Sequence, residues 1–149
     1  MTHESIRDLL EAYARSRDPQ YFAADATLEQ VPLGRVLRGR AAIGAMFRTF
    51  YLETFADPVE RILSVAVDDA RGLGVVESVF RGRHLHEALG VAITGSQVEI
   101  PMVGVYELKN GLIGCGRLYF DVASLLGELR RNAHSSPDRA DGRGGPSTR

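Results

Sequence analysis

The sequence lacks most of the features that would place the chain in a specialised class of proteins. Its single cysteine, Cys115, has no second cysteine with which to form an intramolecular disulfide. No apolar run approaches the roughly 20 residues that a membrane-spanning helix requires. The N-terminus lacks the basic and apolar regions of a secretory signal, and the net charge of −1 offers no attraction for nucleic acid. We therefore expect a cytoplasmic protein that binds neither membranes nor nucleic acid.

What the chain does have is the composition of an ordinary globular domain. It contains 149 residues, of which 44% are hydrophobic and 25% are charged, and this length fits a single core. The composition changes at about Arg130, after which glycine, proline and serine replace the larger apolar residues. We expect one domain over residues 1–130 and a disordered tail over residues 131–149.

Hydrophobic spacing predicts three helices in the first part of the chain. The first covers residues 6–14 and ends near Asp18 and Pro19, a pair that can cap a short second helix. The third follows Gly39, ends before Asp57 and Pro58, and has one apolar stripe formed by Ile43, Met46, Phe47 and Phe50.

In the rest of the chain the hydrophobic period falls to two, which is typical of strands. Strands are predicted here at residues 59–67, 74–84, 98–108 and 112–120, and an earlier strand is predicted at 26–31, between the second and third helices. A last short helix is predicted at 123–129. Helices followed by short-turn hairpins favour an α+β fold. We expect a cone-shaped barrel in which the N-terminal helices pack on a strongly curved antiparallel sheet.

The last predicted hairpin determines which residues share a face of the sheet. Its central turn residues are Asn110 and Gly111, a typical tight-turn pair. The register then places on one face Tyr106, Gly104, Met102 and Ile100 with Cys115, Arg117, Tyr119 and Asp121. A mostly apolar face with a few polar groups fits a ligand cavity. The opposite face carries Val103, Val105, Leu118 and Phe120, an apolar patch that suggests a homodimer.

Several polar residues allow two interpretations. Asp121 precedes a helix and can cap it, it can be a carboxylate in an apolar pocket that accepts a proton, and both can hold at once. His84 and His86 lie beside Glu87, but a metal site needs three or four ligands, so we expect a polar pocket rim or a solvated strand end and no metal. Cys115 is expected to be an inert core residue.

The sequence resembles the SnoaL-like polyketide cyclases of the nuclear transport factor 2-like superfamily. The similar stretches are Gly39-Arg40-Ala41-Ala42-Ile43, Phe55-Ala56-Asp57-Pro58, Gly82-Arg83-His84 with Glu87 and Gly90, Thr94 to Pro101, Lys109 to Ile113, and Leu118-Tyr119-Phe120-Asp121. The resemblance covers nearly all of residues 4–130. It implies a cone whose open end receives a small apolar ligand.

The resemblance also implies a reaction and a set of site residues. In these cyclases an aspartate that matches Asp121 is the general base for an intramolecular aldol closure, and no cofactor takes part. We expect Asp121 and Arg83 to be catalytic. The expected substrate-binding residues are Tyr119, His84, Gln30, Arg117, Tyr106 and Met102.

Two alternatives remain open at this point. The stretch Gln30-Val31-Pro32 and the final Asp121 also resemble the limonene epoxide hydrolases, in which two aspartates and an arginine open an epoxide with water. In that case Glu87 would have to supply the second acid. The chain can also be a ligand-binding or association module without catalysis, in which Asp121 is only a helix cap.

Overall fold

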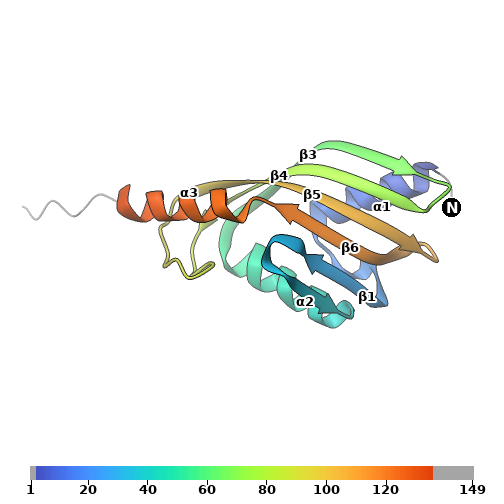
Figure 1. Ribbon diagram of the computed structural model, residues 1–149, viewed down its shortest axis with the longest axis horizontal. Helices are drawn as coiled ribbons and strands as arrows, with labels where there is room; N and C mark the ends of the chain where they lie inside the picture. The colour runs from blue at the N-terminus through green and yellow to red at the C-terminus, as the bar shows by residue number, and fades with distance from the viewer. Residues whose placement is uncertain (1–2, 136–149) are drawn as a thin grey trace, which may run out of the picture.

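The computed structural model describes residues 3–135 (Figure 1). Its elements are α1 (His3–Ser16), the 3-10 turn η1 (Pro19–Tyr21), β1 (Phe22–Gln30), the 3-10 turn η2 (Val31–Leu33), β2 (Arg35–Arg38), α2 (Arg40–Phe47), the π-helix η3 (Arg48–Glu53), β3 (Phe55–Asp68), β4 (Leu73–His84), β5 (Gln97–Lys109), β6 (Leu112–Phe120) and α3 (Val122–Ser135). The helix-first order and the α+β class are confirmed. Among the described residues, no helix combines the length and apolar character needed to cross a membrane.

The strands form one open sheet in the order β2-β1-β6-β5-β4-β3. The helices α1 and α2 lie on the same side of this curved sheet, and α3 extends away from its end (Figure 1). The sheet is mixed, because β1 runs parallel to β6 while all other neighbours are antiparallel. The sequence predicted an antiparallel sheet, so the parallel β1–β6 pair is a correction. The sequence also missed β2, because this four-residue strand is too short to show a period.

Two element boundaries also differ from the prediction. Asp57 and Pro58 lie inside β3, where Asp57 has a φ of 51° and the register with β4 shifts. Helix α3 continues to Ser135, five residues into the predicted tail. The rest of that tail lies outside the described residues.

The register of the β5–β6 hairpin differs from the prediction beyond its first residues. Next to the turn, Leu108 pairs with Ile113 as expected, but a bulge follows and Tyr106 then pairs with Gly116. A Cβ added at Gly116 would lie 3.1 Å from the Tyr106 ring and 2.8 Å from Leu28 Cδ1. Because a cysteine has no room there, the bulge moves Cys115 to the outer face.

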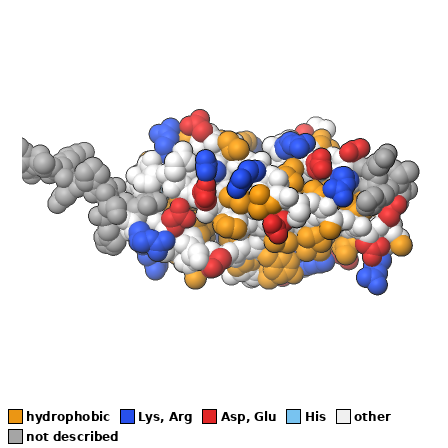
Figure 2. Space-filling model, turned by 90° about the horizontal axis from the view of Figure 1, so that it is seen from above, with side chains coloured by type: hydrophobic (Ala, Val, Ile, Leu, Met, Phe, Trp, Pro, Cys, Tyr) orange, Lys and Arg blue, Asp and Glu red, His pale blue; other side chains and the backbone are white. Residues whose placement is uncertain are grey.

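The outer apolar patch predicted for a homodimer is therefore composed differently. Val103 and Val105 do lie on the outer face, where they are half-buried, and Tyr119 joins them at 42% exposed. Leu118 is instead buried on the inner face, and Phe120 packs against the core. Figure 2 shows one face of the molecule on which hydrophobic side chains alternate with both signs of charge. A homodimer stays a prediction.

Aromatic side chains fill the inside of the curved sheet. These buried rings belong to Tyr13, Phe22, Phe47, Tyr51, Phe55, Phe80 and Tyr106. Most of their contacts are edge-to-face or tilted, with ring centroids 5.1 to 6.0 Å apart, a geometry that stabilises aromatic pairs. The deep interior is therefore packed, which leaves room for a ligand only nearer the surface.

Candidate functional site

A cavity of about 590 Å³ lies between helix α2, the β1–β2 corner and the loop that follows β4. We call it the main cavity. Its volume suits a small organic molecule. Its wall is mostly apolar and is formed by Gln30, Leu33, Arg35, Leu37, Ala42, Ala45, Met46, Thr49, Phe50, Thr54, Glu87, Ala88 and Leu89.

One wall of the main cavity is built by α2 and η3. Their residues at spacings of three and four from Ala42 to Phe50 face the cavity, while Ile43, Phe47 and Tyr51 on another face enter the core. The wider π-turn then brings Thr54 back to the cavity. Its N–H and its hydroxyl both donate to the Thr49 carbonyl, at 2.9 and 2.6 Å. Such π-turns are frequent at functional sites.

Gln30, the last residue of β1, is a buried polar residue that lines the main cavity. It is 4% exposed, and its Nε2 donates only to Met46 Sδ at 3.7 Å. Its Oε1 is buried without a hydrogen-bond partner. Leaving such an acceptor unpaired costs about 1–3 kcal/mol. The sequence predicted Gln30 as a substrate-binding residue, and the structure places it in the wall of the main cavity.

The opposite wall comes from the loop after β4. The N–H groups of Leu85 and His86 both donate to the Thr54 carbonyl, at 2.8 and 3.2 Å, which joins this loop to the π-turn. Glu87 then accepts the Gly90 N–H at 2.7 Å. Among the described residues that line the main cavity, Glu87 supplies the carboxylate and Arg35 the positive charge.

His84 lies at the base of this loop and not in the wall itself. Its side chain is completely buried beside Phe55, with Nδ1 3.1 Å from the Thr94 hydroxyl and Nε2 unpaired. Burial lowers the pKa of His84, which favours the neutral ring. The histidine therefore supports the loop from behind, and its predicted contact with substrate stays a prediction.

Asp121 lies outside the wall of the main cavity and is exposed. Its carboxylate accepts the Ser124 hydroxyl at 2.6 Å and the Ser124 N–H at 2.9 Å, at the start of α3. These hydrogen bonds, the hydroxyl first, lower its pKa. The helix-cap interpretation is confirmed, and the role of this carboxylate as a general base stays a prediction. Together with Met102 and Tyr119, Asp121 borders a separate hollow of about 340 Å³.

The other predicted site residues are also dispersed. Arg83 is exposed and lies 3.8 Å from Asp57, and Arg117 pairs with Glu107 on the outer face at 3.1 Å. Tyr106 is buried in the core. The predicted hairpin face does not form, because after the bulge Tyr106 and Met102 lie on the inner face while Arg117 and Tyr119 lie on the outer face.

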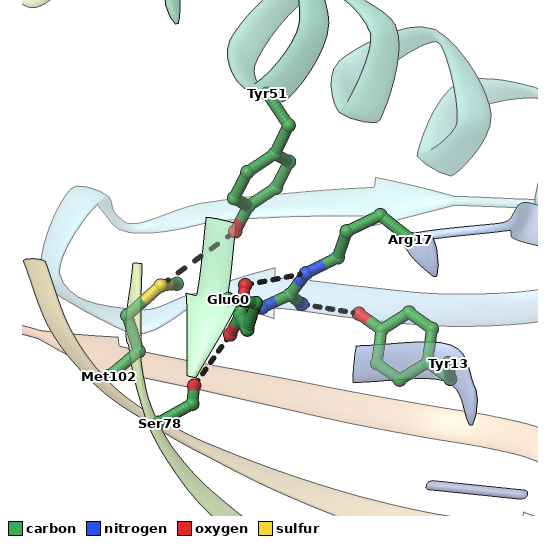
Figure 3. A network of polar contacts seen from close by, with 6 residues as sticks. All are labelled: Tyr13, Arg17, Tyr51, Glu60, Ser78 and Met102. Carbon is green, nitrogen blue, oxygen red and sulfur yellow. Dashed lines mark hydrogen bonds and ion pairs between the residues drawn. The ribbon is translucent and has the colours of Figure 1, made fainter. Parts of the chain in front are cut away.

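The sequence analysis did not predict a buried ion pair, which is shown in Figure 3. Arg17 follows α1 with a φ of 51° and pairs through Nε and Nη2 with both carboxylate oxygens of Glu60. Their side chains are 9% and 4% exposed. Tyr13 and Ser78 complete the network. A glutamate at an inward position of β3 is the signal that could have indicated it.

Comparison with known proteins identifies the family. The family described as SnoaL-like domain matches residues 5–114. The chain belongs to this family. The matched segment contains every residue that lines the main cavity and ends before Asp121. No curated protein sequence gives a significant match.

Solved structures show the same fold for this SnoaL-like domain. TsrD from Streptomyces laurentii has a TM-score of 0.73 at 19% identity, over 87% of this chain and 97% of TsrD. A protein from Jannaschia sp. CCS1, described as a SnoaL-like polyketide cyclase, has a TM-score of 0.72 at 15% identity, over 85% and 92%. A protein with a ketosteroid isomerase-like fold from Catenulispora acidiphila has 0.63 at 19%, over 87% and 95%.

The described part of the SnoaL-like domain offers no evident metal site. Among residues 3–135, no group of three or more His, Cys, Asp or Glu side chains is placed to hold a metal ion. The polar side chains that line the main cavity supply an amide, two threonine hydroxyls, a carboxylate and a guanidinium.

Proposed function

We propose that this SnoaL-like domain binds a small, mainly apolar molecule in the main cavity and acts on it by proton transfer, as a cyclase-type enzyme without a cofactor. The observation that carries the proposal is the buried Gln30 Oε1, which has no hydrogen-bond partner in a mostly apolar wall. Its contact with Met46 is weak, so turning the amide toward a bound hydroxyl gives up little and gains a hydrogen bond. The proposed ligand therefore has an apolar body and one hydrogen-bond donor.

Glu87 is the carboxylate that we propose for the proton transfer. It is the acidic group in the described lining of the main cavity, so a ligand bound against the apolar wall would lie beside a carboxylate that can accept a proton. The aspartate implied by the family resemblance, Asp121, lies outside the lining of the main cavity and accepts hydrogen bonds from Ser124 at both oxygens, whereas Glu87 accepts the Gly90 N–H at Oε1. Opening an epoxide needs a second carboxyl group near the first, so the presence of one acid in the described lining favours cyclase-type proton abstraction.

Binding is tested first, with two probes of similar shape. 2-Naphthol has a hydroxyl donor and 2-methoxynaphthalene has none, and fluorescence titration gives a Kd for each. We expect Gln30→Leu to weaken 2-naphthol binding by about 2- to 10-fold, the net value of one hydrogen bond, and to leave the ether unaffected. Equal losses for both probes would refute the role of the amide. Failure of the unmodified protein to bind either probe would refute the proposed function.

Proton transfer is tested with 5-nitrobenzisoxazole, a generic probe for a base in an apolar pocket. The base removes the C3 proton as the ring N–O bond breaks, and the coloured cyanonitrophenolate product is measured directly. We expect saturable turnover that falls to the buffer rate in Glu87→Gln and persists in Asp121→Asn. The reverse pattern would restore Asp121 as the base. Probe binding without turnover would indicate a non-catalytic ligand-binding module.

A further inference from the structure

The buried pair of Arg17 and Glu60 joins three parts of the fold. Arg17 comes from the end of α1, Glu60 from β3, and Ser78 of β4 donates its hydroxyl to Glu60 at 2.5 Å (Figure 3). Arg17 also donates to the Tyr13 hydroxyl at 2.9 Å. The adjoining cleft has a volume of about 60 Å³, enough for one or two water molecules. The pair is thus not itself a site for an organic ligand.

Tyr51 connects this pair to the π-helix η3. Its ring lies over the Arg17 guanidinium, with Cζ 4.7 Å from the ring centroid, and its hydroxyl points to Met102 Sδ at 3.9 Å (Figure 3). A guanidinium over an aromatic face is attractive, more so when both are buried. Tyr51 is 3% exposed and also packs edge-to-face on Phe50, which faces the main cavity. The core-facing side of η3 therefore contacts the Arg17 guanidinium through the Tyr51 ring.

The cavity-facing side of η3 is connected to both walls of the main cavity. Thr49 and Phe50 belong to one wall, and the Thr49 carbonyl closes the π-turn by accepting the Thr54 N–H. The Thr54 carbonyl in turn accepts the N–H groups of Leu85 and His86, where the other wall begins. A shift of Tyr51 would be passed through this turn to both sides of the cavity.

We propose that Arg17 and Glu60 are positioning residues that set the shape of the main cavity by holding Tyr51 and the π-turn. This role goes beyond the proposed function, because it concerns the geometry of the cavity and not the identity of its occupant. The ion pair is retained in the core to fix one conformation of η3, which neutral side chains of the same size would hold less firmly.

The test uses the charge-neutral double variant Arg17→Met with Glu60→Gln, because either single change leaves a buried charge unpaired and can prevent folding. Tyr51→Leu, which removes the ring over Arg17, is the second variant. The first readout is amide hydrogen exchange at Thr54, Leu85 and His86, compared with amides in the centre of β5. We expect at least about 10-fold faster exchange at the three amides and little change in β5. This readout needs no ligand.

The second readout is the Kd for 2-naphthol, which does rest on the proposed function. We expect about 10-fold weaker binding in both variants. Leu10→Ala is the matched control, because Leu10 is fully buried against Gly74 and lies outside the described lining of the main cavity. It should reduce global stability without changing the Kd or the relative exchange at Thr54.

Unchanged exchange at the three amides in both variants would overturn the proposal, whatever the binding result. Equal local exchange in Leu10→Ala and the double variant would also overturn it, because the pair would then be a global stabiliser only. Failure of the unmodified protein to bind 2-naphthol would refute the proposed function alone, and the exchange measurement would still decide the role of the pair.

Discussion

Gly104→Ala tests whether the interior of the sheet is as tightly packed as the structure indicates. A Cβ added at Gly104 would lie 2.1 Å from the Tyr106 hydroxyl oxygen and 2.5 Å from both Cε2 and Cζ of that ring. The ring has little room to withdraw, because it lies close over Gly116 on one side and against the Tyr13 ring at 5.3 Å. The substitution must therefore displace a fully enclosed side chain.

Two opposing effects decide the size of the change. Alanine restricts the unfolded chain and gains about 0.4–1 kcal/mol, provided that the native backbone accepts it. Overpacking a buried site costs about 1–3 kcal/mol, and contacts this short place the cost near the upper value. We expect the free energy of unfolding to fall by about 2 kcal/mol and Tm to fall by about 4–8 °C in a domain of this size.

Urea denaturation of a double-mutant cycle separates the clash from other effects. Tyr106→Phe removes the nearest atom but leaves the two carbons at 2.5 Å, so Gly104→Ala should cost somewhat less in that background. Tyr106→Leu removes all three atoms, and the cost should then largely disappear. The packing argument is refuted if Gly104→Ala has wild-type stability, or if its cost is the same beside leucine as beside tyrosine.

Two further predictions concern titrating groups. Burial lowers the pKa of His84 below its ordinary value of 6.5, so near that pH the unfolded chain binds a proton that the folded chain does not. The free energy of unfolding should therefore fall as the pH decreases from about 6.5. Urea titrations should show a smaller dependence of this free energy on pH in His84→Gln. An equal slope would assign the pH dependence to other groups. Asp121→Ala should reduce the helical circular dichroism of α3 more than Asp121→Asn, which keeps an acceptor for the Ser124 N–H; identical spectra would contradict the cap.

The sequence predicted the elements better than their pairing. The spacing from Ile6 to Ala14 and the alternation in the four long strands predicted real elements, because one face of each is buried. The parallel β1–β6 pair could not be read from local pattern, since it joins segments from opposite ends of the chain. The η3 π-turn was predicted as ordinary helix, because it keeps the same apolar stripe.

The candidate site was only partly predictable for a related reason. Gln30 was selected because Gln30-Val31-Pro32 resembles a family stretch, and the structure places it in the wall of the main cavity, while its contact with substrate stays a prediction. The group around Asp121 depended on a hairpin register, and one extra residue at the bulge inverted every later side chain. The pairing of Arg17 with Glu60 is a contact between residues far apart in the sequence, and the inward position of Glu60 on β3 was its one local signal.

The parallel pairing of β1 with β6 has a consequence for how the chain reaches its native state. Leu28 in β1 pairs with Gly116 in β6, so the first strand to be synthesised acquires its inner neighbour only when the last strand has emerged. Until then the β2–β1 ribbon and the free edge of β5 both expose unpaired backbone. Such a non-local closing step slows folding and favours aggregation before completion. A fragment that ends at residue 114 would lack this closing strand and should not fold on its own.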